Sequence, residues 1–252
     1  MKVFVASVYK PGSWDLYKAQ RWFLDQTTAD YRQLIVSSKI PPFECEYLLA
    51  DQGQREGGQR HLAGLLAARD WFRVHAADFD LGLILDSDAF PVRKGWDRDI
   101  ARLLKKTRCQ FAAPVRAENL DAFPHISFLA FLPAALGLVA AHLRRDRRGL
   151  TLFRRQSRRD TAASLPMRQC FPLIKSNVYS PHPTMHSIYG DMAYHAAATG
   201  HGGRMRSLRR YWPLVTDLAR FEQFETVPAS PAWINRLLGE PRFSETDFPL
   251  PS

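Results

Sequence analysis

Two carboxylates, Asp86 and Asp88, are the residues of this chain best suited to chemistry, and they follow directly on the apolar run 81–85. A short apolar run bounded by a turn signal, here Pro91, is typical of a buried central strand. Residues two apart in an extended chain point to the same side, roughly 6–7 Å apart at about 3.3 Å per residue. Both acids can therefore address one Mg²⁺ or Mn²⁺ ion, which characteristically lies between carboxylates and substrate phosphates. The alternative is a turn pair that merely ends the strand, because aspartate favours turns.

The apolar patterning predicts the elements that must position this pair. Strands are expected over 3–8, 31–37, 43–49, the run that leads into Asp86, 109–115 and 126–132, and helices over 14–25, 59–75, 96–106 and 134–143. This alternation through residue 143 indicates a layered α/β domain with a largely parallel sheet. Metal and nucleotide then lie at the carboxyl ends of the strands, where Asp86 and Asp88 fall.

Composition narrows the compartment and the partners. A chain of 252 residues with a net charge of +10 fits one α/β domain and indicates an anionic partner. Three cysteines without paired spacing indicate neither a zinc site nor a disulfide framework. The segment 1–9 is too short for a signal peptide, and 126–143 is too polar for a membrane span. We therefore predict a cytoplasmic protein that touches a membrane, if at all, peripherally on its inner face.

The chain changes character after residue 143. The stretch 144–160 holds eight arginines and two aspartates, and its only stacking residue is Phe153. It is either a solvated loop or a dock, over Arg144–Arg159, for anionic lipid or a phosphorylated glycan, and no nucleic-acid partner is expected. We predict one catalytic domain over 1–226, with 144–160 as a basic insertion, and a Pro- and aromatic-rich tail over 227–252 that packs on the body.

The chain resembles the GT-A glycosyltransferases, which use nucleotide sugars and have a Rossmann-like nucleotide half. The resemblance spans about residues 1–200 and rests on the strand 3–8, the helix 59–75, Ile84-Leu85-Asp86-Ser87-Asp88 with Phe90-Pro91, Gly95-Trp96, and a strand over 187–195 that brings a histidine back to the metal. It implies a GT-A-like Rossmann-type αβα sandwich. The implied reaction is metal-dependent transfer of a sugar from a nucleotide-diphosphate sugar to a cell-envelope glycan or lipid-linked saccharide.

The resemblance also implies roles for single residues. Asp88 ligates Mn²⁺ or Mg²⁺, Asp86 holds the ribose or completes the metal shell beside Ser87, and His195 is the third ligand, with His186 as a weaker candidate. The donor's base is flanked by three residues at the end of the first strand: Val5, Ala6 and Ser7. The alternative for either histidine is a structural or surface role.

Other candidates come from the chain's own chemistry. Arg60 or His61, at a helix opened by Gly57-Gly58, can meet phosphate or base, or can simply be solvated. An inverting transferase needs a carboxylate base, for which Asp191, Asp121 and Glu118 are candidates, whereas a retaining enzyme needs none. His125 is a candidate acceptor contact beside core residues.

Three other functions compete with the transferase. A phosphotransferase of the haloacid dehalogenase type also ends a strand in Asp-x-Asp, but its motif normally lies on the first strand. A nucleotidyltransferase is a further alternative, but the Gly-Ser helix start expected shortly before the two acids is missing from this sequence. A basic nucleic-acid or membrane-surface module with a structural Asp86/Asp88 pair predicts binding that collapses with salt and ignores metal.

Overall fold

A seven-stranded sheet forms the centre of the structure, a computed structural model that describes residues 1–11, 13–50, 57–115, 123–143, 146–150, 157–160, 164–174 and 187–195. Its strands are β1 (Val3–Val8), β2 (Tyr31–Ser37), β3 (Glu46–Leu49), β4 (Leu81–Asp86), β6 (Phe111–Val115), β7 (Phe128–Phe131) and β10 (Cys170–Ile174). Their order is β10-β6-β7-β4-β1-β2-β3, and every neighbouring pair is parallel except the two that β7 forms. The prediction of an α/β fold with a mostly parallel sheet is therefore confirmed.

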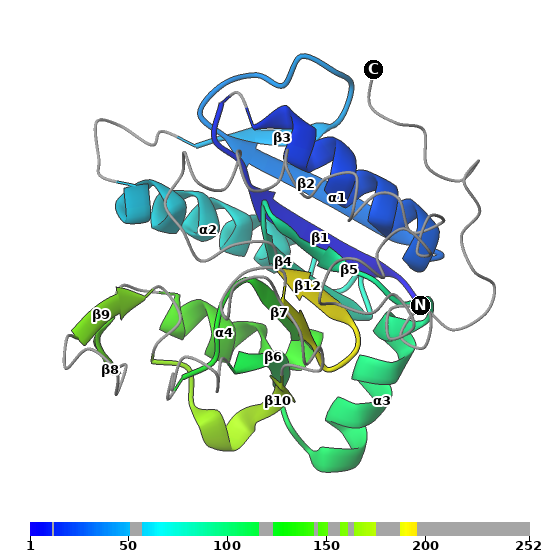
Figure 1. Ribbon diagram of the computed structural model, residues 1–252, viewed down its shortest axis with the longest axis vertical. Coiled ribbons are helices and arrows are strands. Elements are labelled where there is room, and N and C mark those ends of the chain that lie inside the picture. Colours follow the sequence, from blue (N-terminus) through cyan, green and yellow to red (C-terminus); the bar gives the residue numbers. More distant parts are fainter. Residues whose placement is uncertain are drawn as a thin grey trace, which may run out of the picture.

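Helices cover both faces of this sheet (Figure 1). They are α1 (Trp14–Thr27), α2 (Gly57–Val74), α3 (Trp96–Thr107) and α4 (Leu136–His142). Successive side chains of a strand point to opposite faces, so β1 sends Phe4 to a core layer under α2 and α4, and Val5 to a layer under α1 and α3. The result is a three-layered arrangement with an apolar core on each side of the sheet.

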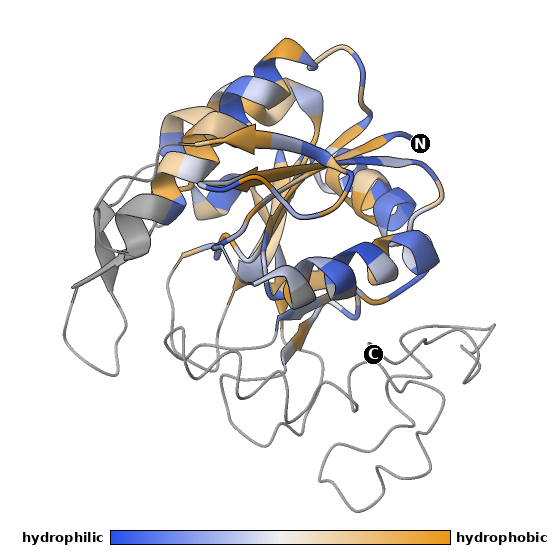
Figure 2. Ribbon diagram, turned by 90° about the horizontal axis from the view of Figure 1, so that it is seen from above, coloured by the Kyte–Doolittle hydropathy of each residue, from blue (hydrophilic) through white to orange (hydrophobic). Residues whose placement is uncertain are grey.

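Hydropathy follows these layers. Figure 2 shows apolar colour concentrated on the central strands and hydrophilic colour on the outer sides of the helices. All six residues of β1 are buried, as expected for a strand with parallel neighbours on both sides and helices on both faces. Within the described part of the chain, no helix has both the length and the apolar character that crossing a membrane requires.

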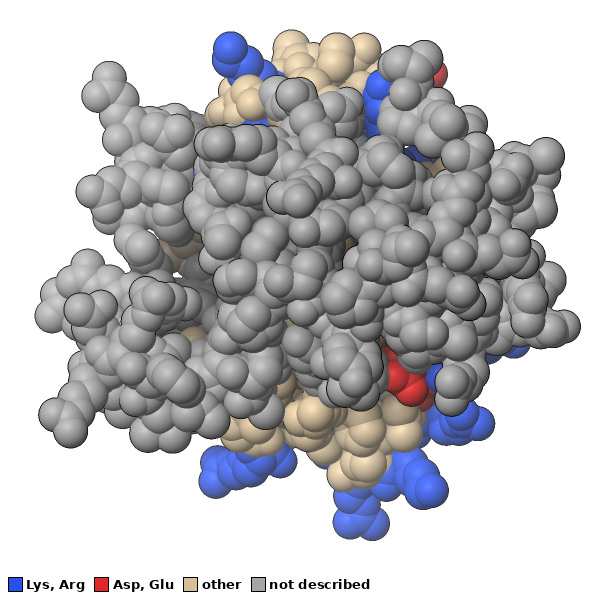
Figure 3. Space-filling view, viewed as in Figure 1, with Lys and Arg blue, Asp and Glu red and all other residues tan. Residues whose placement is uncertain are grey.

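Helix α3 has charge at both ends. Asp97 and Asp99 lie in its first turn and Lys105 and Lys106 in its last, the distribution that the helix dipole favours. Basic side chains lie along the lower edge of the molecule in Figure 3, including its lower right, where Figure 1 places α3. This helix therefore adds exposed positive charge on the outer surface.

A second, smaller sheet leans on the end of β4. Its strands are β5 (Ala89–Pro91), β11 (Ser187–Tyr189) and β12 (Ala193–His195), in the antiparallel order β11-β12-β5. The single strand predicted over 187–195 is therefore wrong, because the chain reverses within it. Gly190 and Asp191 both have φ of 58°, a left-handed conformation that turns the chain between the two strands.

The basic insertion contains regular structure where the structure describes it. Strands β8 (Asp146–Leu150) and β9 (Ser157–Asp160) pair in an antiparallel hairpin, and whether this segment is solvated or docks on a partner stays a prediction. The expected helix over 134–143 begins as a 3-10 turn at Pro133–Ala135 before α4. The predicted tail 227–252 lies outside the described residues.

Candidate metal and nucleotide site

The strand order reverses between β1 and β4, whose carboxyl ends lie at the same edge of the sheet. From β1 the chain moves outward to β2 and β3, and β4 then returns to the other side of β1. In open α/β sheets, ligands bind outside the carboxyl ends of the strands at such a reversal. Asp86, the last residue of β4, pairs in register with Val8, the last residue of β1. The carboxylate predicted to bind metal or ribose therefore lies at this reversal, at the carboxyl ends of the two strands.

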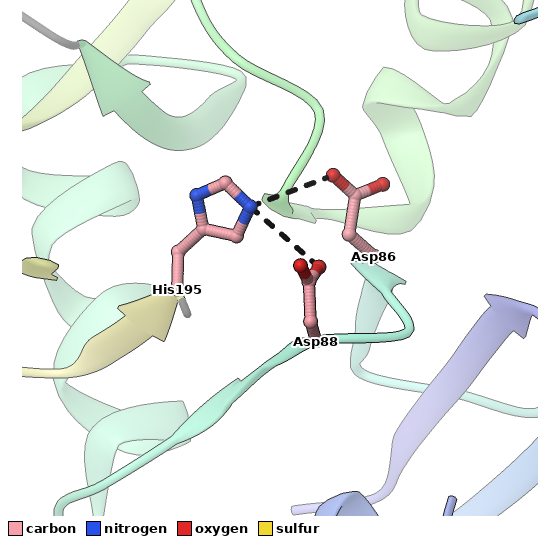
Figure 4. Close-up of side chains that lie close together, drawn as sticks. All are labelled: Asp86, Asp88 and His195. Carbon is pink, nitrogen blue, oxygen red and sulfur yellow. Dashed lines mark ion pairs between the residues drawn. The ribbon is translucent and has the colours of Figure 1, made fainter. Parts of the chain in front are cut away.

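Asp86, Asp88 and His195 converge at the carboxyl end of β4 (Figure 4). These three residues are the candidate metal group, called the metal group below. Nε2 of His195 lies 3.6 Å from Oδ1 of Asp88 and 4.0 Å from Oδ2 of Asp86. One ligand atom from each residue lies within 4.8 Å of the others. Asp88 is fully buried and His195 is 4% exposed, and burying carboxylates is costly without compensating charge or donors. The donor set, two carboxylates and one imidazole, fits Mn²⁺ or Mg²⁺.

The small sheet brings His195 to the two aspartates. His195 pairs with Ala89, the residue that follows Asp88. The hairpin is anchored one residue further along, where Phe90 stacks on Tyr194 at 4.7 Å and on Phe23 of α1 at 4.1 Å between ring centroids. Aromatic packing between α1, β5 and β12 thus places the histidine.

His61 of α2 contacts the other side of Asp86. Its Nε2 lies 3.3 Å from Oδ1 of Asp86. Burial alone would raise the pKa of Asp86, but a hydrogen bond and charge from His61, with the charges of His125 and His195, lower that pKa well below its ordinary value. Asp86 is therefore a carboxylate, the form that metal binding requires. His61, which was predicted to meet phosphate or base, thus contacts Asp86 of the metal group.

A third histidine borders the group. The ring of His125 lies 5.5 Å from that of His195, and its Nδ1 accepts a hydrogen bond of 3.2 Å from the Ser127 backbone N–H. Ser127 is held in turn, because its carbonyl accepts from the Asp86 N–H at 3.0 Å. Because Nδ1 accepts this hydrogen bond, Nε2 is the nitrogen from which the ring can donate. His125 is thus suited to donate a hydrogen bond rather than to ligate a metal.

Sequence reasoning missed Gln20, which is fully buried beneath the Asp86–Asp88 turn. Its amide nitrogen donates to the backbone carbonyls of Asp86 at 3.0 Å and Ala89 at 2.7 Å. A signal was present, since Gln20 falls on the stripe of α1 that also carries Tyr17 and Leu24, both in the core. A polar residue on an apolar stripe needs partners that the helix itself does not supply.

The structure places other predicted residues in surroundings of a different kind. Val5 and Ala6 are buried in the two core layers, and the Ser7 hydroxyl donates to Gln20, so their burial gives no support to a contact with the donor's base. Asp191 is exposed in the turn between β11 and β12, at the opposite end of β12 from His195. The structure does not bring this candidate base to the metal group.

Several candidates are not placed by the structure. Ser87 lies in the turn between the two aspartates and is half-buried. Asp121, Glu118 and His186 lie outside the described residues, as does the side chain of Arg60. Their roles stay predictions.

Comparisons with known proteins give little beyond this geometry. No protein-family model matches the chain, and no curated protein matches it. Among solved structures it is similar to the glycosyltransferase GlyE of Streptococcus pneumoniae TIGR4, with 14% sequence identity and a TM-score of 0.38. The match covers 55% of this chain and 36% of that one, so the chain spans about a third of that protein's length. At this level of similarity, function has to be inferred from the site itself.

Proposed function

We propose that the chain is a metal-dependent glycosyltransferase of the GT-A type, which transfers a sugar from a nucleotide-diphosphate sugar. One observation carries the proposal: Asp86, Asp88 and His195 gather at the carboxyl end of β4, beside the reversal in strand order where nucleotides bind in open α/β sheets. A metal group at that place is positioned to meet the diphosphate of a nucleotide.

The residues divide the work at this site. Asp88, His195 and Asp86 would hold Mn²⁺ or Mg²⁺, and His61 contacts Oδ1 of Asp86. When bound, the ion neutralises the charge that builds on the leaving diphosphate. The burial of Asp88 and His195 keeps water away from the group and strengthens its electrostatics. His125, through its Nε2 proton, is suited to donate to an anionic or hydroxyl group of a substrate.

The remaining substrate features are proposed from chemistry alone. The acceptor is a cell-envelope glycan or lipid-linked saccharide, reached by a cytoplasmic protein that touches the anionic inner face of a membrane through Arg144–Arg159. The net charge of +10 favours such an anionic partner. If the reaction inverts configuration, Asp121 and Glu118 remain the candidate bases, because Asp191 lies away from the metal group.

Two alternatives make different predictions. A basic binding module with a structural aspartate pair binds anions without metal, and its binding falls steeply with salt. A phosphotransferase that uses Asp86 or Asp88 forms an aspartyl phosphate and turns over phosphate esters without a nucleotide sugar. Neither alternative function requires His195 to lie close to Asp86 and Asp88.

Nucleotide binding followed by thermal unfolding tests the proposal. Wild type is melted with UDP, GDP, CDP or ADP, in Mn²⁺ and in EDTA, beside Asp88→Asn. The control is Asp80→Asn. Asp80 directly precedes β4, at the end of the strand opposite to Asp86, and its Oδ2 accepts a hydrogen bond of 2.8 Å from the Lys2 backbone N–H. A nucleotide at a hundred times its Kd adds about 2.7 kcal/mol to the free energy of unfolding.

The expected result is a rise in Tm with one nucleoside diphosphate that requires Mn²⁺. The rise disappears in Asp88→Asn and persists in Asp80→Asn. Absence of a rise with all four nucleotides overturns the proposal, and a rise that EDTA leaves unchanged favours the binding module.

A further inference from the structure

The buried side chain of Gln20 forms hydrogen bonds with residues of four strands, β1, β2, β4 and β5. It is fully buried, and burying an amide is costly unless its hydrogen bonds are satisfied. Both hydrogens of its amide nitrogen are used, one on the carbonyl of Asp86 and one on that of Ala89. These two carbonyls bracket Ser87 and Asp88, so a single amide group holds both ends of the metal-binding turn.

The orientation of this amide is determined by its partners. Backbone carbonyls only accept hydrogen bonds, so the nitrogen must face Asp86 and Ala89. The oxygen then faces three donors, which are the hydroxyls of Ser7 at 2.7 Å and Tyr9 at 2.6 Å and the Gln33 amide at 2.9 Å. The donor and acceptor sides cannot be exchanged without opposing like groups.

The partners of the oxygen come from the sheet itself. Ser7 lies in β1, Tyr9 follows it directly, and Gln33 lies in β2. Burial raises the pKa of Tyr9 well above its ordinary value, so its hydroxyl stays protonated and keeps donating. Gln20 thereby connects β1 and β2 to the turn that carries the acids.

We propose that Gln20 is the positioning residue that sets the Asp86–Asp88 turn in the geometry required to bind the divalent ion. The inference rests on the proposed function, because it concerns the same metal group. Groups that orient metal ligands typically change metal affinity 10–100-fold when they are replaced. Gln20 touches neither metal nor substrate in this role, and it acts through the backbone of the turn.

Direct Mn²⁺ binding, followed by electron paramagnetic resonance of the free ion, tests the inference. Gln20→Met removes both sides of the amide with little change in side-chain length. Thr28→Val is the matched control, because it removes another buried hydrogen bond, made by the residue that caps α1: Thr28 Oγ1 accepts from Trp96 Nε1 at 2.9 Å. Tyr9→Phe is a milder variant that removes one of the three donors to the Gln20 oxygen. Tm is measured for every variant, and hydrogen exchange of the segment 85–90 is followed without metal.

The inference predicts an Mn²⁺ Kd for Gln20→Met that is about 10-fold or more above wild type. Thr28→Val keeps the wild-type Kd even where its Tm falls, and Tyr9→Phe weakens binding in the same direction by less. Exchange over 85–90 rises in Gln20→Met and not in Thr28→Val. If Gln20→Met does not fold, the same pattern in Tyr9→Phe decides.

The outcomes separate this inference from the proposed function. Wild type that binds Mn²⁺, with an unchanged Kd in Gln20→Met or Tyr9→Phe despite a lower Tm, overturns the inference alone. Wild type that binds neither Mn²⁺ nor Mg²⁺ overturns the metal site of the proposed function, and the inference with it.

Discussion

His61 and Asp86 are joined across the layers of the fold, with Nε2 of the histidine 3.3 Å from Oδ1 of the aspartate. The contact connects α2 to the end of β4, and it leaves Oδ2 of Asp86 on the side of His195. The carboxylate of Asp86 thus contacts the imidazole of His61 through Oδ1 and faces His195 through Oδ2.

Replacing His61 is expected to weaken metal binding without unfolding the protein. His61→Ala removes the group that orients Asp86, and loss of such a partner costs about 10–100-fold in metal affinity. His75→Ala is the control, because His75 pairs with exposed Asp78 just beyond the other end of α2. Calorimetric titration with Mn²⁺ measures both, and equal affinities in the two variants would contradict a role for His61.

Gly64 is expected to tolerate no side chain. A Cβ at this position of α2 would lie 2.5 Å from Cγ1 of Val8, so the helix packs directly on β1 near the site. Gly64→Ala therefore overpacks the core, at a cost of about 1–3 kcal/mol in the free energy of unfolding. Gly137→Ala in α4 meets no atom within 4 Å and should instead stabilise by up to about 1 kcal/mol. Urea denaturation compares the two, and similar shifts for both would refute the close approach.

Phe90 is expected to affect the position of His195 as well as stability. Its ring is 1% exposed and stacks between Phe23 and Tyr194. Phe90→Ala costs about 3–5 kcal/mol, as does Phe72→Ala in the opposite core layer. Only Phe90→Ala loosens β12, so only that variant should lose Mn²⁺ affinity. Titration at a temperature where both variants stay folded distinguishes them, and equal losses would argue against this route.

Cys170 is expected to be the least reactive thiol of the folded chain at pH 8. Burial raises the pKa of Cys170 to about 12, whereas Cys45 and Cys109 are only half-buried. Because the unfolded thiol ionises at lower pH, this group's contribution to stability is present below pH 9 and is lost as the pH rises towards 12. Alkylation with iodoacetamide followed by peptide mass spectrometry measures the rates. Labelling of Cys170 as fast as that of the other two would contradict its burial.

Local patterning predicted most of the sheet but not the contacts that complete the site. Continuous apolar runs indicated β1 and β4 because both faces of these strands are covered. The Asp-x-Asp pair was visible because both acids follow one strand. Gln20 was missed because its partners, among them Gln33 and Ala89, meet only once the sheet is assembled.

The hairpin that carries His195 shows the same limit. Its histidine was a candidate metal ligand, yet its reversal was not foreseen. The left-handed φ of Asp191, a residue other than glycine, marks a turn that composition alone does not reveal. Pairing of β12 with β5, and not local propensity, brings the ring to Asp88.

The ligands of the proposed metal group are far apart in the sequence, so they are synthesised at different times. A ribosome finishes Asp86 and Asp88, and most of the central sheet, long before it reaches His195 on the last described strand. We therefore expect a nascent chain that ends before β12 to hold metal weakly or not at all. The ion would then bind late and link β12 to the end of β4 only after synthesis has passed His195.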